Sequence, residues 1–133
     1  MTVVFADTFY FLALLNSGDE AHAVARQFAV DKSARLLTTT WVLTELADGL
    51  AETRGRTIIV PLIRELERNP QAEVIPPESS LWQRAIELYD RRPDKGWSLT
   101  DCISFVTMKD RSINDALTGD HHFEQAGFRA LLK

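Results

Sequence analysis

Several acidic residues lie at, or one turn beyond, the carboxyl ends of segments that the sequence pattern predicts to be β-strands. Asp7 directly follows the apolar run TVVFA, and Asp120 follows the segment DALTG. Glu45 lies one turn into the helix predicted after RLLTT, and Asp101 lies in the first turn of its own predicted helix. Because ligands of parallel sheets bind outside the carboxyl ends of the strands, these side chains can converge on one cleft.

Carboxylates that converge repel one another and raise one another's pKa values unless a cation holds them. Oxygen ligands without an accompanying cysteine pattern suit a hard ion such as Mg²⁺ or Mn²⁺. Asp101 adds a second argument, because it falls inside the apolar arc of the predicted helix WSLTDCISFVTMKD, beside Phe105 and Met108. An unpaired charge there is expensive, so we expect a metal ion or a polar partner at Asp101.

Helix capping offers a plainer interpretation of three of these acids. Asp7 and Asp120 can each cap the helix that follows directly, and capping is the preferred interpretation for each taken singly. Ser98 and Asp101 have the spacing of a capping box, in which the acid reaches back to the serine N–H. Glu45 is harder to explain in this way, because it lies at the edge of an apolar stripe. As a set, the acids favour a metal site.

Strand and helix patterns alternate along the chain. Strands are predicted at 2–6, 35–39, 72–76, 115–119 and 128–132, and helices at 8–16, 20–32, 41–53, 57–69, 79–92, 97–110 and 121–126. Pro61 makes the early turns of the fourth helix uncertain, and the fifth is opened by serine caps at Ser79 and Ser80. Such alternation predicts an α/β fold: three α/β/α layers around a central, mostly parallel five-stranded sheet.

Length and composition suit one globular domain spanning residues 1–133, with 45% hydrophobic and 26% charged residues. No apolar run is long enough to span a membrane, and the start of the chain lacks the pattern of a signal peptide. The single cysteine, Cys102, is expected to be a core residue of a cytoplasmic protein. The net charge of −4 argues mildly against binding nucleic acid through phosphate contacts alone. A divalent ion among the acids would remove part of that negative field.

Four segments resemble successive motifs of PIN-domain nucleases: VVFADTFYFLALLN, TTWVLTELADGL, WSLTDCISFVTMKD and ALTGDHHFEQAGF. The resemblance covers essentially the whole chain and is greatest to the VapC-type ribonucleases of toxin–antitoxin pairs. It implies a PIN-like fold and an endoribonuclease that depends on Mg²⁺, with Mn²⁺ able to substitute. It also implies an RNA substrate, a small antitoxin whose C-terminal segment lies across the active-site groove, and a homodimer.

The same resemblance gives the four acids catalytic and metal-binding roles. It makes Asp7 and Asp101 the principal ligands, with Glu45 and Asp120 as ligands or as partners through water. In such enzymes a bound metal ion activates water and stabilises charge on the phosphate. Carboxylates suit this chemistry because they leave coordination positions for water and phosphate.

Five neighbouring positions refine this expectation. Thr118 matches the hydroxyl residue that precedes the last acid by two positions, and Thr8 matches the residue after the first acid. Phe9 departs from the family pattern, in which this position is often small or polar. Adjacent histidines point in different directions on a helix, so we expect His121 and His122 to form a solvated helix start rather than a metal site.

Three alternatives remain. One is a stand-alone RNA-processing nuclease, and another is a PIN-like scaffold that binds RNA or protein without cutting. A short antitoxin-like reading frame directly upstream would separate the toxin from the stand-alone enzyme. A phosphatase with Asp7 as nucleophile is disfavoured, because Phe9 occupies the position where such enzymes typically carry a second aspartate.

Overall fold

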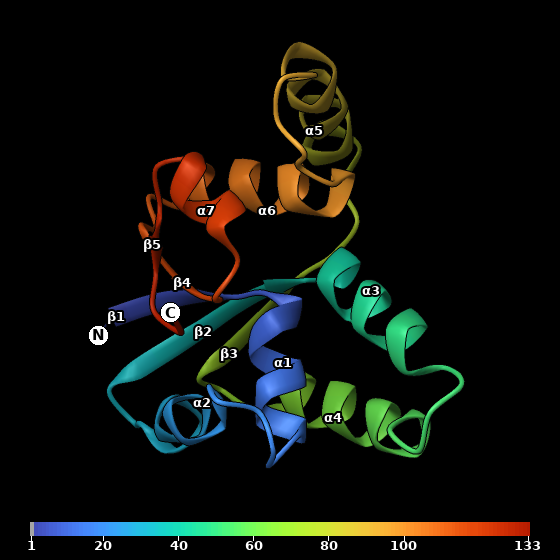
Figure 1. Cartoon of the computed structure of the whole chain (residues 1–133), viewed down its shortest axis with the longest axis vertical. Coiled ribbons are helices and arrows are strands. Elements are labelled where there is room, and N and C mark those ends of the chain that lie inside the picture. Colours follow the sequence, from blue (N-terminus) through green and yellow to red (C-terminus); the bar gives the residue numbers. More distant parts are fainter. Residues whose placement is uncertain (1) are drawn as a thin grey trace.

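A five-stranded parallel sheet forms the centre of the molecule (Figure 1). The computed structural model describes residues 2–133. The strands are β1 (Thr2–Ala6), β2 (Ala34–Thr39), β3 (Ala72–Ile75), β4 (Asp115–Leu117) and β5 (Arg129–Ala130). Their spatial order is β3-β2-β1-β4-β5, and all neighbouring pairs are parallel. The chain therefore builds outward in both directions from β1, which places the ligand-binding crevice at the carboxyl end of that strand.

Helices cover both faces of this sheet. They are α1 (Thr8–Leu15), α2 (His22–Val30), α3 (Thr40–Leu50), α4 (Arg56–Arg68), α5 (Ser79–Arg91), α6 (Leu99–Asp110) and α7 (His121–Gln125). Figure 1 shows α1, α2 and α4 on one side of the sheet and α6 and α7 on the other, with α5 beyond α6. Helix α3 leaves the end of β2 and contacts both α1 and α6. The predicted three-layer arrangement is confirmed.

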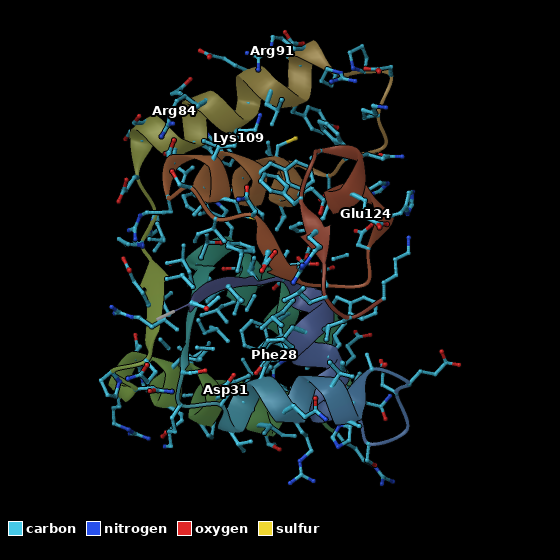
Figure 2. All side chains as sticks on the ribbon, turned by 90° about the vertical axis from the view of Figure 1, so that its left-hand side faces the viewer. Phe28, Asp31, Arg84, Arg91, Lys109 and Glu124 are labelled. Carbon is cyan, nitrogen blue, oxygen red and sulfur yellow. The ribbon has the colours of Figure 1, made fainter. Side chains whose placement is uncertain are left out.

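Helix α6 is buried around most of its circumference because it lies between the sheet and α5 (Figure 1). This position explains why apolar residues are not confined to one face of its sequence. On the outer side, Arg84 of α5 donates two hydrogen bonds of 2.7 Å to the carboxylate of Asp110 at the end of α6. Figure 2 shows Arg84 and Lys109 between these two helices. Cys102 is buried in the core, as predicted, and burial raises the pKa of its thiol to about 11.

Two local predictions need correction. Helix α5 is not opened by serine caps: Glu78 is its N-cap residue, and Ser79 and Ser80 already lie inside the helix. The reason is the extended backbone of Glu78 (φ −131°, ψ 135°), which moves the start of the helix to Ser79. The last two strands are shorter than predicted: β4 ends at Leu117, and β5 contains only Arg129 and Ala130. Pro61 lies within α4 without ending it. Within residues 2–133, no helix has the length and apolar character to cross a membrane.

Candidate active site

The structure brings the four predicted acids to the carboxyl edge of the sheet. Asp7 follows β1, Asp120 follows β4, Glu45 lies on the helix after β2, and Asp101 lies in the first turn of α6. The charges of Asp101 and Glu45 act on Asp7, and the charge of Asp120 acts on Asp101. The acids therefore form a connected cluster around the crevice that the strand order creates.

Asp7 is the most deeply buried of these acids, with 5% of its surface exposed. Its Oδ2 accepts a hydrogen bond of 2.9 Å from Thr118 Oγ1. The pKa of Asp7 is raised to about 7, and burial is the largest cause. The Thr118 hydrogen bond opposes this shift, and the charges of Asp101 and Glu45 contribute to it. Although Asp7 occupies the N-cap position of α1, its side chain makes no capping bond. The capping interpretation is therefore wrong for this side chain.

Thr8 connects the beginning of α1 to α3. Its Oγ1 donates a hydrogen bond of 2.5 Å to Glu45 Oε1, although Glu45 remains exposed to solvent. The two hydroxyl residues expected to support the site thus contact different acids: Thr8 contacts Glu45, and Thr118 contacts Asp7. Each bond fixes one carboxylate oxygen and so limits how that side chain can rotate.

Asp101 caps α6 and also lies in the acidic cluster. The capping box is complete, since Ser98 Oγ accepts from the Asp101 N–H at 3.0 Å and Asp101 Oδ2 accepts from the Ser98 N–H at 3.1 Å. The side chain is also buried and belongs to the acidic cluster. Burial raises the pKa of Asp101, and the negative charge of Asp120 adds to the increase.

Asp120 caps α7, as its position predicts. Its Oδ1 accepts a hydrogen bond of 2.9 Å from the backbone N–H of His122. Its own N–H donates to Thr118 Oγ1 at 3.1 Å. The hydroxyl of Thr118 therefore joins the backbone of Asp120 to the carboxylate of Asp7, which couples the beginning of α7 to the end of β1.

The two histidines differ in their surroundings. The side chain of His121 is 64% exposed, as expected for a solvated helix start. That expectation is wrong for His122, whose Nδ1 lies 3.2 Å from Asp101 Oδ2 and 3.4 Å from Asp120 Oδ1. Capping of α7 by Asp120 turns the second residue of the helix toward the acids. The sequence does contain a sign of this role, because His122 lies two residues after Asp120, a predicted ligand.

Phe9, the departure from the family pattern, packs beside the last acid. A Cβ atom added to Gly119 would lie only 2.5 Å from Cζ of Phe9. The aromatic ring therefore occupies the space that a side chain at position 119 would need. A large residue fits at position 9 because the residue that it contacts, at position 119, is glycine.

The donor set fits a hard divalent ion. Four carboxylates would supply oxygen ligands, which Mg²⁺ and Mn²⁺ favour. Within residues 2–133, no lysine or arginine forms a salt bridge with any of these acids. A divalent cation would supply the missing positive charge. The ligand atoms of Asp120, His121 and His122 lie within 4.8 Å of one another, but this tighter group includes only one of the predicted acids.

Comparison with known proteins assigns the family. The sequence model of the PIN domain matches residues 4–129, almost the whole chain. The chain belongs to the PIN-domain family. This PIN domain is 28% identical, over 127 residues, to a protein of Mycobacterium tuberculosis named 23S rRNA-specific endonuclease VapC20, and the alignment covers 95% of both chains.

Solved structures agree with this assignment. The crystal structure of M. tuberculosis VapC20, described as a sarcin–ricin loop cleaving toxin, has a TM-score of 0.83 at 28% identity and covers 94% of this PIN domain and 95% of that chain. FitAcB from Neisseria gonorrhoeae has a TM-score of 0.64 at 18% identity and covers 96% of this PIN domain and 95% of that chain. The structure of VapBC2 from Rickettsia felis, bound to a DNA fragment from their promoter, has a TM-score of 0.67 at 13% identity. It covers 97% of this PIN domain and 96% of that chain. The last two share the fold.

Proposed function

We propose that this PIN domain is a metal-dependent endoribonuclease and the toxin of a toxin–antitoxin pair. The observation that carries the proposal is the buried carboxylate of Asp7, which is surrounded by the charges of Asp101 and Glu45 at the carboxyl edge of the sheet. Such a cluster costs folding free energy unless a cation binds there. Family membership and the similarity to the named endonuclease VapC20 make RNA hydrolysis the chemistry it best fits.

The roles of the side chains follow from this proposal. Asp7 and Asp101 hold Mg²⁺, for which Mn²⁺ can substitute, and Glu45 and Asp120 bind the ion directly or through water. When bound, the ion lowers the pKa of water and stabilises negative charge on the phosphate and the leaving oxygen. Thr118 keeps the carboxylate of Asp7 in a fixed orientation through its hydrogen bond. In the same way, Thr8 fixes Glu45.

The choice of RNA rests on the relative. VapC20 is named as a 23S rRNA-specific endonuclease and as a toxin that cleaves the sarcin–ricin loop. We propose a structured loop of 23S rRNA as the substrate of this PIN domain as well. Proteins recognise such RNA largely through its shape and its unpaired bases.

The proposal includes partners. We propose a small antitoxin whose C-terminal segment lies across the acidic cluster, where an arginine side chain would supply positive charge. We also propose a homodimer that forms through α5, since Trp82, Ile86 and Tyr89 share one face of this helix and are exposed. The protein would act in the cytoplasm, with residues 1–133 as a single domain.

The test compares the wild type with the Asp101→Asn variant on a 23S rRNA fragment containing the sarcin–ricin loop and on a pool of other structured RNAs. We expect cleavage by the wild type in Mg²⁺ and in Mn²⁺, and none in excess chelator. Asp101→Asn should abolish cleavage because it removes a ligand charge while its amide oxygen can still accept from Ser98. Circular dichroism should show an unchanged fold.

Asp115→Asn is the matched control, since Asp115 lies at the start of β4 and pairs with Arg129 outside the cluster. This variant should cleave like the wild type. A fully active Asp101→Asn enzyme would contradict the proposal. Equal background in all three proteins, together with no binding of Mn²⁺ by calorimetry, would instead favour a PIN-like binding scaffold.

A further inference from the structure

His122 lies between two acids of the cluster and belongs to none of the roles described so far. Its Nδ1 atom is 3.2 Å from Asp101 Oδ2 and 3.4 Å from Asp120 Oδ1. Its backbone N–H also donates to Asp120 Oδ1 at 2.9 Å. Only 23% of the side chain is exposed, whereas the adjacent His121 is 64% exposed. The imidazole is therefore held at a bridging position rather than free in solvent.

The hydrogen bonds at Asp101 determine which of its oxygens remains available. Oδ2 accepts from the Ser98 N–H at 3.1 Å and contacts His122 Nδ1 at 3.2 Å. When Asp101 is ionised, as a metal ligand is, its carboxylate can only accept hydrogen bonds, and Nδ1 of His122 then carries the hydrogen in this contact. Two donors on one oxygen fix the rotation of the carboxylate. Within residues 2–133, Oδ1 of Asp101 has no such donor.

We propose that His122 is a positioning residue, which holds Asp101 through Nδ1–H and so leaves Oδ1 free to bind a metal ion. This inference rests on the proposed function, in which Asp101 is a principal ligand. Removing a group that hydrogen-bonds to a metal ligand and orients it commonly lowers metal affinity or activity by about 10- to 100-fold. The 3.4 Å approach of the same nitrogen to Asp120 Oδ1 is a close contact and not a second hydrogen bond, and it places the imidazole between acids from two elements, α6 and the beginning of α7.

Two variants with amide side chains distinguish the roles of the two ring nitrogens, Nδ1 and Nε2. In His122→Asn the side-chain amide lies near the former position of Nδ1, whereas in His122→Gln it reaches the position of Nε2. Both variants lose the ring, so their effects on packing are similar. His121→Asn is a control, because His121 is adjacent and exposed.

The measurements are the Kd for Mn²⁺ by calorimetry, the kcat and KM for the RNA that the wild type cleaves, and the melting temperature in chelator. We expect His122→Gln to weaken Mn²⁺ binding by about 10- to 100-fold and to lower kcat with little change in KM for RNA. His122→Asn should remain within a few-fold of the wild type in its Kd for Mn²⁺ and in its kcat. His121→Asn should be unchanged.

Three results would overturn the inference. If His122→Gln binds Mn²⁺ as tightly as the wild type does, the imidazole does not position Asp101. If Gln restores binding and Asn does not, His122 acts through Nε2. If Asn and Gln weaken binding equally, the ring contributes only its shape. Failure of the proposed function looks different: the wild type itself would then neither bind Mn²⁺ nor cleave RNA, and the inference would fall with it.

Discussion

Thr118 illustrates how a single side chain organises this site. Its hydroxyl donates to Asp7 and accepts from the N–H of Asp120, so it joins two acids that are far apart in the sequence. Serine could make both bonds, but valine could make neither. Phe9 and Gly119 also depend on each other, through steric contact instead of hydrogen bonding.

We predict that Gly119→Ala disturbs the site because of the ring of Phe9. The new Cβ would lie 2.5 Å from that ring, and overpacking of this kind costs about 1–3 kcal/mol of unfolding free energy. Cleavage should fall as well, because Gly119 lies between Thr118 and Asp120. In a Phe9→Ala background the same substitution should cost much less. Urea unfolding and cleavage rates of the single and double variants measure this coupling.

Gly49→Ala is the matched control for this substitution. Gly49 lies in α3, and nothing lies within 4 Å of an added Cβ there. Alanine is a better helix former than glycine, so this variant should be neutral or slightly stabilised. An equal cost of Gly119→Ala with and without Phe9 would show that the ring is not the cause.

At the scale of elements, the N-termini of three helices lie at the site. Helices α1, α6 and α7 begin beside Asp7, Asp101 and Asp120, and Glu45 lies on α3. Helix N-termini carry partial positive charge, which favours nearby anions and offsets part of their repulsion. The same positions that cap helices can therefore also gather carboxylates, which is why capping and metal binding are compatible at Asp101.

We predict that α5 mediates the proposed homodimer. Trp82, Ile86 and Tyr89 recur at helical spacing and are 37%, 36% and 54% exposed. A charge in this face should be costly to bury, so Ile86→Glu should convert the dimer to monomer in analytical ultracentrifugation. Ile58→Glu on α4 is the control, because Ile58 is 43% exposed and lies on a different element. A monomer produced by Ile58→Glu alone would place the interface on α4 instead.

At the scale of the whole molecule, the sheet determines how strongly the acids interact. The order β3-β2-β1-β4-β5 puts β1 in the middle, so the residue that follows it is surrounded by protein on both sides. Asp7 is consequently buried, and burial is the largest cause of its raised pKa. The stability of the whole fold should therefore depend on the protonation of this one carboxyl group.

We predict that Asp7 makes the metal-free protein less stable as the pH rises from about 4 to about 7. Burial raises the pKa of Asp7 from 3.8 to about 7, so the folded protein binds more protons than the unfolded chain in this window. The free energy of unfolding then falls as pH rises, by about 4 kcal/mol for a shift of this size. Asp7→Asn has no proton to lose at this position, and it can still accept from Thr118.

Urea unfolding in chelator from pH 4 to pH 8 measures this linkage. The wild type and Asp7→Asn should differ least at pH 4, and Asp7→Asn should become more stable by several kcal/mol as the pH approaches 8. Added Mn²⁺ should reduce the difference, because a cation stabilises the ionised form. A difference that does not change with pH would mean that Asp7 ionises normally in the folded protein.

The sequence by itself determined the elements and the identity of the acids. Hydrophobic periodicity and residue type are local properties, so β1 and α6 could be placed closely, and Asp7 and Asp101 could be recognised as unusual. The parallel sheet followed from the alternation of these elements, and the family resemblance from the order of the motifs. That the four acids hold a metal stays a prediction.

Only the tertiary structure decided how these residues meet. The bond between Thr118 and Asp7 joins positions 111 residues apart, and Asp101 and His122 are 21 residues apart. Such contacts depend on strand order and helix packing, which local sequence patterns do not encode. For this reason the sequence favoured capping for Asp7 and solvent for His122, whereas the fold directs the first to Thr118 and the second to Asp101.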